Sequence, residues 1–163
     1  MKEHMKEHMM GGCPGSKMQD FRKDTKGGKE DGGTRQSQLK QWPIQLHLVS
    51  PEAPYFEKAD VLLTADCVAY ALADFHKDYL KGKSIAIACP KLDEGQDVYV
   101  EKITSFIDDA KINTLTVLTM QVPCCGGLVA MAEQALQSAK RKIPVKSIVI
   151  SLQGEVLSED WIK

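Results

Sequence analysis

The chain has 163 residues, of which 43% are hydrophobic and 26% charged, with 21 basic against 22 acidic side chains and a formal net charge of −1. This composition predicts one ordinary globular domain and leaves little room for a second. No block of Lys and Arg is long enough to follow a phosphate backbone, which argues against nucleic acid as a partner. The longest apolar runs are too short for a membrane span or a secretory signal, so we expect a cytoplasmic protein without a membrane partner.

Residues 1–38 differ in composition from the rest of the chain. They contain no Ile, Leu or Val and hold seven of the twelve glycines. Such a segment buries too little apolar surface to offset the entropy lost on ordering. We therefore expect a flexible N-terminal segment over residues 1–38 and an α/β domain over residues 39–163. A short tandem repeat spaces His4 and His8 by four residues, which fits either a metal pair on one helical face or a polar tail.

From residue 39 onward, apolar runs of strand length alternate with longer amphipathic segments. Helices are expected over residues 68–80 and where apolar residues recur with helical spacing, near residues 100–110 and 128–139. Near-continuous Val, Ile and Leu runs are typical of strands buried on both faces of a parallel sheet. The alternation predicts a three-layer, doubly wound α/β fold with a mostly parallel sheet of about five strands, whose order the sequence does not reveal. These strands are expected at residues 45–49, 61–64, 84–88, 114–120 and 145–151.

The five cysteines form the main functional signal, because an odd number in a reducing compartment favours metal or thiol chemistry over disulfides. Cys67 follows the second expected strand, Cys89 the third, and the pair Cys124 and Cys125 the fourth. The carboxyl ends of parallel strands share the edge where such folds bind ligands, so we expect these thiols to converge there. For any single one, a buried and inert cysteine is the alternative. Cys13 lies in a Gly- and Pro-rich segment, which fits either a fifth thiolate at that edge or a free thiol.

Several centres use converging thiols. Four thiolates fit an iron–sulfur cubane, and the helix amides that follow Gly126 and Gly127 suit anionic sulfur. Zinc is an alternative, although structural zinc sites usually draw ligands from close Cys-x-x-Cys pairs, which are absent here. A thiol-based redox enzyme of flavodoxin-like fold, with Cys124 or Cys125 as nucleophile, is another. The sequence has no dinucleotide, phosphate-loop or catalytic-triad motif.

Short motifs around the cysteines resemble a family of iron–sulfur-cluster-binding proteins from anaerobic prokaryotes. The similarity covers roughly residues 37–157, together with an upstream element at residues 12–16. Many members of that family also carry a ferredoxin module, whose Cys-x-x-Cys-x-x-Cys run this chain lacks. The motifs that carry the resemblance are residues 38–46, residues 53–56, Ala65-Asp66-Cys67, Cys89-Pro90-Lys91-Leu92-Asp93 and Val122-Pro123-Cys124-Cys125-Gly126-Gly127.

The resemblance implies one [4Fe–4S] cluster used in electron transfer or redox sensing, with a redox partner protein that the sequence does not identify. Its implied ligands are Cys67, Cys89, Cys124 and Cys125, with Cys13 as a further candidate. A cubane needs four protein ligands, so one of five thiols would be spare. We expect either a fixed ligand set or an exchange between Cys124 and Cys125 when the oxidation state changes.

Other polar residues fit structural roles as well as functional ones. His47 and His76 are expected within a strand and a helix, away from the cysteine edge, in structural or surface roles. Asp66 and Lys91 are expected near the thiols, where they either tune the charge of the site or carry protons, or else cap and solvate the loops. Three aromatic side chains are expected to cover the sheet edge or pack under the site: Trp42, Tyr55 and Phe56.

Overall fold

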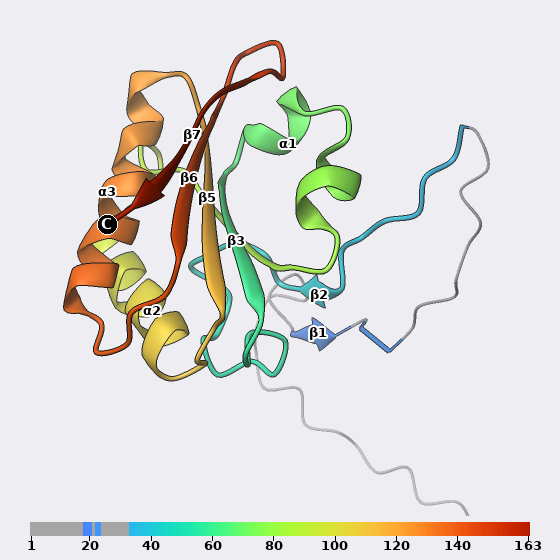
Figure 1. Ribbon diagram of the computed structural model, residues 1–163. Helices are drawn as coiled ribbons and strands as arrows, with labels where there is room; N and C mark the ends of the chain where they lie inside the picture. The colour runs from blue at the N-terminus through green and yellow to red at the C-terminus, as the bar shows by residue number, and fades with distance from the viewer. Residues whose placement is uncertain (1–17, 21, 24–32) are drawn as a thin grey trace, which may run out of the picture.

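The computed structural model describes residues 18–20, 22–23 and 33–163, whose main body is a five-stranded sheet between two layers of helices (Figure 1). The strand order is β4-β3-β5-β6-β7. Strands β3 to β6 run parallel, and β7 runs antiparallel to β6. The expected doubly wound, mostly parallel α/β fold is therefore confirmed. The strands are β3 (Asp60–Ala65), β4 (Ser84–Ala88), β5 (Thr114–Met120), β6 (Val145–Ile150) and β7 (Val156–Ile162).

The helices divide between the two faces of the sheet. The chain winds from β3 to β4 in one direction and from β5 to β6 in the other, which places the connecting helices on opposite faces. Figure 1 shows α1 on one side of the sheet and α2 with α3 on the other. No helix in the described part of the chain is long and apolar enough to cross a membrane. The helices are α1 (Val68–Ala71), the π-helix η2 (His76–Leu80), α2 (Gln96–Asp108), the 3-10 helix η3 (Pro123–Cys125) and α3 (Gly126–Ser138).

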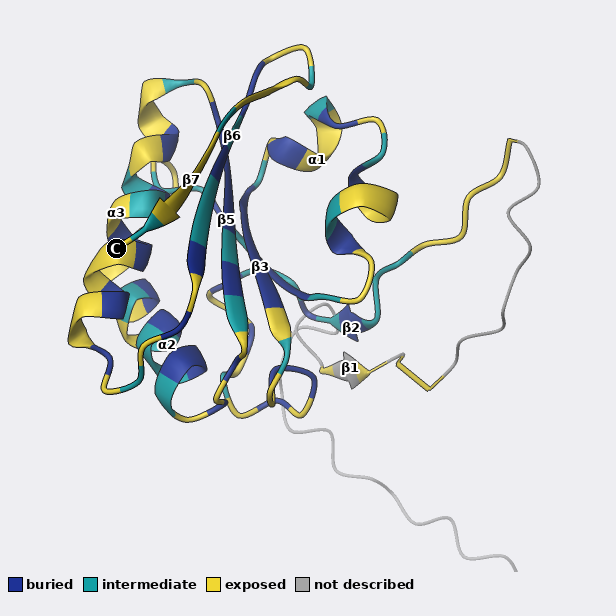
Figure 2. Cartoon of the chain, viewed as in Figure 1, coloured by how far each residue is buried: buried dark blue, intermediate teal, exposed yellow. Residues whose placement is uncertain are grey.

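The core lies between the sheet and these helices. Five of the six residues of β3 are buried, as expected for a central parallel strand covered on both faces. The expected apolar stripe of α2 is buried, including Ile103, Phe106 and Ile107, and α3 buries Leu128 and Met131. Figure 2 shows the dark core strands beside β7, which is exposed along most of its length. The apolar periodicity of the sequence therefore located the two long helices correctly.

The strand expected at residues 45–49 is wrong. Gln45 forms a single parallel bridge with Ile87, and the chain then turns, since the Val49 amide donates to the Gln45 carbonyl at 3.0 Å. The turn points three carbonyl groups at one cation: Lys102 Nζ lies 2.7–2.9 Å from the carbonyl oxygens of residues 46, 47 and 49. This tertiary contact favours the turn over the strand that the apolar run indicated.

One further expectation about an element is wrong, and one strand of the structure was not expected. The helix expected over residues 68–80 is broken into α1 and η2. The loop between β6 and β7 packs against the end of α1, because a Cβ added at Gly154 would collide with the Ala71 carbonyl oxygen. Strand β7 was not expected, because its exposed residues 156–162 lack the apolar run of a buried strand.

The N-terminal residues contribute a second, small sheet. Strand β1 (Gln19–Asp20) pairs antiparallel with β2 (Gln41–Trp42), so part of the segment expected to be flexible joins the domain through backbone pairing. The boundary expected at residue 38 is therefore less sharp than the composition indicates. The candidates His4, His8 and Cys13 lie outside the described residues.

Tyr55 and Phe56 are fully buried, but not under the cysteine site. The Ser84 hydroxyl donates a hydrogen bond to the Tyr55 carbonyl, and Ser84 begins β4. These two aromatic residues therefore pack at the amino end of the sheet, opposite the expected position, because the chain passes through the core before it enters β3. Trp42 is half-buried in β2.

Candidate cysteine site at the carboxyl edge of the sheet

Four cysteines follow three strands that are neighbours in the sheet. Cys67 comes after the central strand β3, Cys89 after β4 on one side, and Cys124 with Cys125 after β5 on the other. The winding of the chain reverses around β3, and folds of this type bind ligands at such a reversal, outside the carboxyl ends of the strands. This edge lies at the top of Figure 1, where α1 and the loop between β6 and β7 are drawn.

The loops that carry these cysteines touch one another. A Cβ added to Gly127 would lie 3.1 Å from the Pro90 Cβ, so the loop after β4 packs against the first turn of α3. The Asp66 amide, next to Cys67, donates to the carbonyl of Ala88, next to Cys89, at 3.2 Å. No group of three or more His, Cys, Asp or Glu side chains within the described ranges has the spacing of a formed metal site. The structure thus brings these loops together without a preassembled ligand cage among the residues it describes.

The adjacent cysteines differ in their surroundings. Cys125 is only 6% exposed and occupies the N-cap position of α3, whereas Cys124 is exposed. Burial raises the pKa of the Cys125 thiol, and the neighbouring Cys124 and Cys67 raise this pKa further, against a hydrogen bond with the Met120 backbone that lowers it. A cysteine used as a nucleophile needs a lowered pKa. Cys125 therefore has the environment of a buried thiol, and the thiolate that a nucleophile or a metal ligand needs would form there only with a bound positive charge nearby.

The first turn of α3 supplies backbone donors at the same edge. The helix has 13 residues, and its N-cap residue Cys125 makes no side-chain hydrogen bond to the first turn. Amide N–H groups at an uncapped helix start lack intrahelical partners and favour negative charge. The Gly126 amide already donates to the Pro123 carbonyl in η3, so anionic sulfur beside Gly127 would meet the positive end of the helix and the amides that follow Gly126.

Cys89 is held by a network that the sequence did not reveal. Asp93 Oδ2 accepts hydrogen bonds from the Cys89 amide at 2.9 Å and from the Tyr99 hydroxyl at 2.5 Å. Gln45 Nε2 reaches the same oxygen at 3.5 Å. Gln96 Nε2 donates to the Pro90 carbonyl at 2.5 Å, which fixes the next residue of the loop. The available signal was the acidic residue four positions after the cysteine, at a spacing that lets a side chain cap the loop.

The same network sets the ionisation of its members. Burial opposes ionisation of Asp93, but the hydrogen bonds from Tyr99, the Cys89 amide and Gln45 outweigh it and lower the pKa of this carboxyl group. Burial and the hydrogen bond to Asp93 raise the pKa of Tyr99. Asp93 is therefore a carboxylate and Tyr99 a neutral donor near neutral pH. Together they anchor the backbone that carries Cys89.

Asp66 lies between the cysteine loops. Its amide donates to the Ala88 carbonyl at 3.2 Å, which ties the ends of β3 and β4 together. Its Oδ1 atom is buried and has no hydrogen-bond partner among the residues that the structure describes, so this atom does not cap the loop. Burial and the charge of Asp93 raise the pKa of Asp66. Lys91, in contrast, is exposed to solvent.

His47 lies at the cysteine edge, so its expected position is wrong. Gln45 pairs with Ile87 near the end of β4, and the following turn brings His47 beside the loop after that strand. The His47 Nε2 atom is 2.8 Å from the Glu94 carbonyl oxygen, and its ring packs on Tyr99 with centroids 4.4 Å apart. These contacts fit the structural role expected for this histidine.

His76 begins η2, and its Nδ1 atom accepts a hydrogen bond from the Gln38 amide at 3.0 Å. This bond joins the segment before β2 to the helical layer. The contact is to a backbone group, as expected for a histidine with a structural role.

Comparison with known proteins agrees with this architecture. The Rossmann-like domain family matches residues 53–163, more than half of the chain. An uncharacterized protein of Archaeoglobus fulgidus is 31% identical over 121 residues, which cover 73% of this chain and 83% of that protein. No solved structure matches the chain. Since the matched region contains the whole doubly wound sheet, from β3 to β7, the chain belongs to the Rossmann-like domain family.

Proposed function

We propose that this protein binds one [4Fe–4S] cluster at the carboxyl edge of its sheet and serves in one-electron transfer or redox sensing. The observation that carries the proposal is the placement of Cys67, Cys89 and the pair Cys124 and Cys125 after three adjacent strands, where the winding reverses. Cys13 is a further candidate ligand. A cytoplasmic location belongs to the same proposal, because thiols stay reduced there.

The residues present fit such a group. Iron–sulfur clusters take four cysteine thiolates and are tuned by hydrogen bonds to sulfur and by burial. This edge offers thiols from three loops, one buried at Cys125, together with the N-terminal end of α3, which favours negative charge. The cluster, when bound, would supply the one-electron couple. The chain's own part is to hold the thiolates and to keep the Cys89 loop in place through Asp93.

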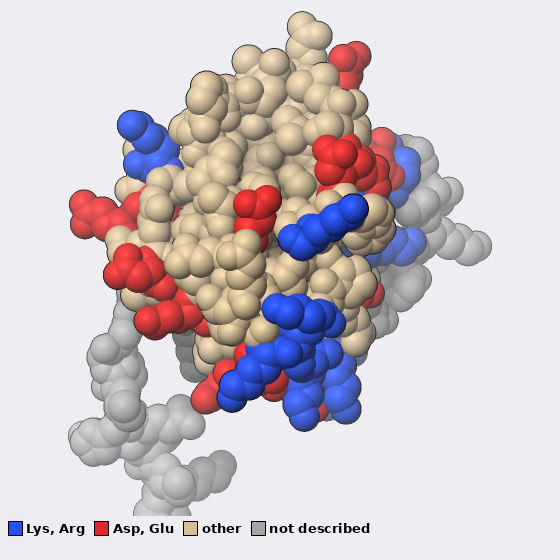
Figure 3. Space-filling model, turned by 60° about the vertical axis from the view of Figure 1, so that its left-hand side comes forward, with Lys and Arg blue, Asp and Glu red and all other residues tan. Residues whose placement is uncertain are grey.

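Exposed apolar side chains around this edge support a protein as the redox partner. Tyr70 is 94% exposed, Leu92 79% and Leu152 65%, and they come from three different loops or helices beside the site. On the face shown in Figure 3, few charged side chains lie at the upper end, whereas Lys and Arg gather at the lower end. A weakly charged, partly apolar rim suits contact with another protein surface.

The test is anaerobic purification of the full chain. The proposal expects brown protein with broad visible absorption, bleached by dithionite, and with iron and sulfide in matched amounts. Colourless protein that contains zinc would support a zinc-stabilised interaction module instead. Colourless protein without metal would favour a thiol-based redox enzyme, for which Cys124 is the better nucleophile because burial raises the pKa of Cys125. Either colourless result would refute the cluster.

Variants then assign the ligands. Cys67→Ser and Cys89→Ser should each lower the iron content, because an iron that loses a thiolate takes a weaker oxygen ligand. Lys91→Ala is the matched control, since this exposed side chain lies on the same loop as Cys89. Unchanged iron and spectrum in either serine variant would remove that cysteine from the ligand set.

The proposal includes an exchange between Cys124 and Cys125, one acting as the resting ligand and the other as the alternate. The buried and exposed positions of the two thiols support distinct roles. Iron content is compared in Cys13→Ser, Cys124→Ser and Cys125→Ser, and the loop is compared in oxidised and reduced wild-type protein. A fully dispensable member of the pair, with an identical loop in both states, would exclude the exchange.

A further inference from the structure

A hollow of about 280 Å³ lies at the amino end of the sheet, opposite the end that carries the cysteine loops. It forms where the segments of β1 and β2 meet the chain that enters β3 and β4. Pockets for drug-sized molecules measure about 300–1,000 Å³, so this hollow suits a smaller ligand. The charged side chains that line it are Arg22, Lys40, Glu57, Lys58 and Lys83.

The carboxylates near this hollow act on Arg22. Asp20 Oδ2 accepts a hydrogen bond from the Arg22 guanidinium at 2.7 Å. This hydrogen bond raises the pKa of Arg22 against the effect of burial, and the charges of Asp20 and Glu57 raise it further. The ammonium groups of the three lysines, in contrast, form no ion pair with any residue that the structure describes. Three positive charges therefore line the hollow without a described partner.

Backbone contacts hold the segments that carry these lysines. Lys40 is half-buried beside Gln41, whose buried Oε1 atom accepts a hydrogen bond from the Ile85 amide at 2.8 Å. The Lys58 amide donates to the Ala110 carbonyl at 3.0 Å. The third lysine directly precedes β4 and is half-buried as well. Three separate segments thus meet at one hollow, and the flexible four-carbon stem of lysine lets each ammonium group turn toward an anion bound there.

The number of unpaired cations indicates the chemical class of ligand. Three ammonium groups around a small hollow favour a compact anion with more than one negative charge and several acceptor oxygens. A phosphate group at neutral pH carries about two negative charges and three strong acceptor oxygens. Lysine binds phosphate as a point charge, without the planar geometry that pairs arginine with carboxylates. A phosphate group therefore matches this lining better than a single carboxylate does.

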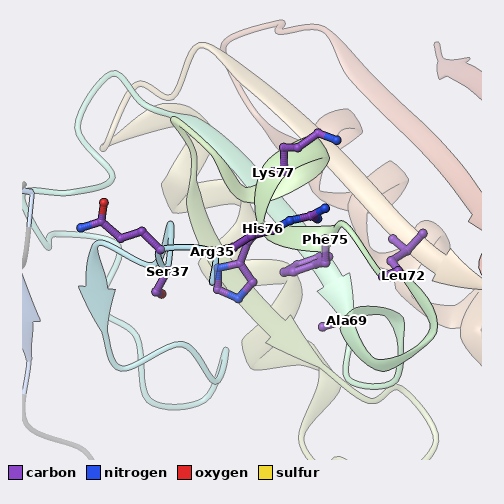
Figure 4. Close-up of a pocket in the computed structure, with 9 residues that line it drawn as sticks. Arg35, Ser37, Ala69, Leu72, Phe75, His76 and Lys77 are labelled. Carbon is purple, nitrogen blue, oxygen red and sulfur yellow. The ribbon is translucent and has the colours of Figure 1, made fainter. Parts of the chain in front are cut away.

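A second hollow has cations that are already paired. Figure 4 shows this hollow of about 340 Å³, with Arg35 and Lys77 among the residues that line it. Arg35 forms an ion pair with Asp74, and Lys77 Nζ lies 3.5 Å from the same carboxylate. An anion there would meet the charge of Asp74. The hollow lined by the three unpaired lysines is therefore the better anion site.

We propose that the hollow at Lys40, Lys58 and Lys83 binds a small molecule that carries a phosphate dianion. This chemistry is shared by inorganic phosphate and by the phosphate monoester of a small metabolite. The site is separate from the ligand set proposed above and does not depend on a cluster, because it lies at the other end of the sheet. Binding should weaken as salt is added, since the three side chains are partly or fully exposed to solvent.

The test titrates the purified full chain with inorganic phosphate, glycerol 3-phosphate and acetate at constant ionic strength, with iron measured in the same samples. Backbone amide signals of Lys58, Ala59, Gly82 and Lys83 are followed by NMR. Both phosphate probes should shift these signals saturably, whether or not iron is present. Acetate, a monoanion, should bind at least about fivefold more weakly, because it leaves an ammonium group unpaired.

The two phosphate probes distinguish the sources of the ligand. Tighter binding of glycerol 3-phosphate would support a phosphate monoester, and equal affinity would support inorganic phosphate. Absence of saturable shifts, or acetate that binds as tightly as phosphate, would refute the site. Shifts confined to Gly126 and Gly127 would place the anion at the start of α3 and would also overturn the proposal.

Lysine variants complete the experiment. Lys40→Gln and Lys83→Gln should each weaken phosphate binding about threefold, and the double variant about tenfold, because each removes one partly exposed ion pair. Lys77→Gln is the matched control, since this lysine lines the hollow of Figure 4 and faces Asp74, and it should bind phosphate as wild type does. Unchanged binding in the double variant, or an equal loss in Lys77→Gln, would contradict the proposal.

Discussion

Replacing Asp93 by alanine should destabilise the loop that carries Cys89 and, with it, the fold. The carboxylate accepts hydrogen bonds from the Cys89 amide at 2.9 Å and from the Tyr99 hydroxyl at 2.5 Å, and Tyr99 is fully buried. Hydrogen bonds to charged groups contribute about 1.5 kcal/mol each at the low end, so two of them predict a loss of roughly 3 kcal/mol of unfolding free energy at neutral pH. Asp93→Asn keeps an acceptor oxygen without the charge and should lose about half as much.

The unfolding free energy lost in Asp93→Ala should become smaller as the pH falls. Despite burial, the hydrogen bonds from Tyr99, Cys89 and Gln45 lower the pKa of Asp93 in the folded state. Such a carboxyl group stabilises the fold fully above its unfolded pKa of about 3.9, and this contribution disappears as the pH falls through the lower, folded value. The difference in unfolding free energy between wild type and Asp93→Ala should therefore decrease below about pH 4.

Urea unfolding measures both effects, with the fluorescence of Trp42 and Trp161 as the signal. Glu94→Ala is the control, because it removes the exposed carboxylate next to Asp93 and should change stability by less than about 0.5 kcal/mol. An Asp93→Ala variant as stable as Glu94→Ala would refute the anchoring role of this carboxylate. A difference in unfolding free energy between wild type and Asp93→Ala that stays constant from neutral pH down to about pH 3 would refute this role as well.

Three further changes test the fold. Lys102→Met leaves three turn carbonyls without their shared donor and should cost about 2 kcal/mol in urea unfolding, whereas the exposed Lys140→Met should cost almost nothing. Gly154→Ala should lower the free energy of unfolding more than Gly82→Ala does. Both glycines have a positive φ, which costs alanine about 1 kcal/mol, but only at residue 154 would the added Cβ collide with backbone atoms. Deleting residues 1–10, which contain no Ile, Leu or Val, should change neither the urea midpoint nor the iron content, and a loss of iron would implicate His4 or His8.

The buried strands could be predicted from sequence because burial on both faces leaves a clear pattern. Residues 84–88 and 114–120 form strands with the expected bounds, and each is a run of apolar and small residues. The long helices α2 and α3 followed from apolar spacing, which burial on one face requires. Strand β7 could not be found in this way, since an exposed edge strand buries neither face.

The errors share a physical cause, namely contacts between residues far apart in sequence. Residues 45–49 form a turn because Lys102, in α2, donates hydrogen bonds to three of their carbonyl groups. The segment 68–80 breaks at the point where Gly154 packs on Ala71. In the sequence Asp93 is only the last residue of a motif, and its role depends on Tyr99 in α2 and on the distant Gln45. Local pattern cannot report such partners.

The strand order determines whether the cysteines can share one site. In sequence, Cys67, Cys89 and Cys124 are separated by 22 and 35 residues, and strand ends alone would allow them to lie far apart along one edge. The observed order β4-β3-β5 places β3 between the other two strands. Neighbouring strands lie about 4.8 Å apart, so three consecutive strand ends span roughly 10 Å, a distance that side chains and short loops can bridge to one shared centre. An order with β6 between β3 and β5 would have separated these loops, and the same cysteines would then have been better explained as independent buried thiols.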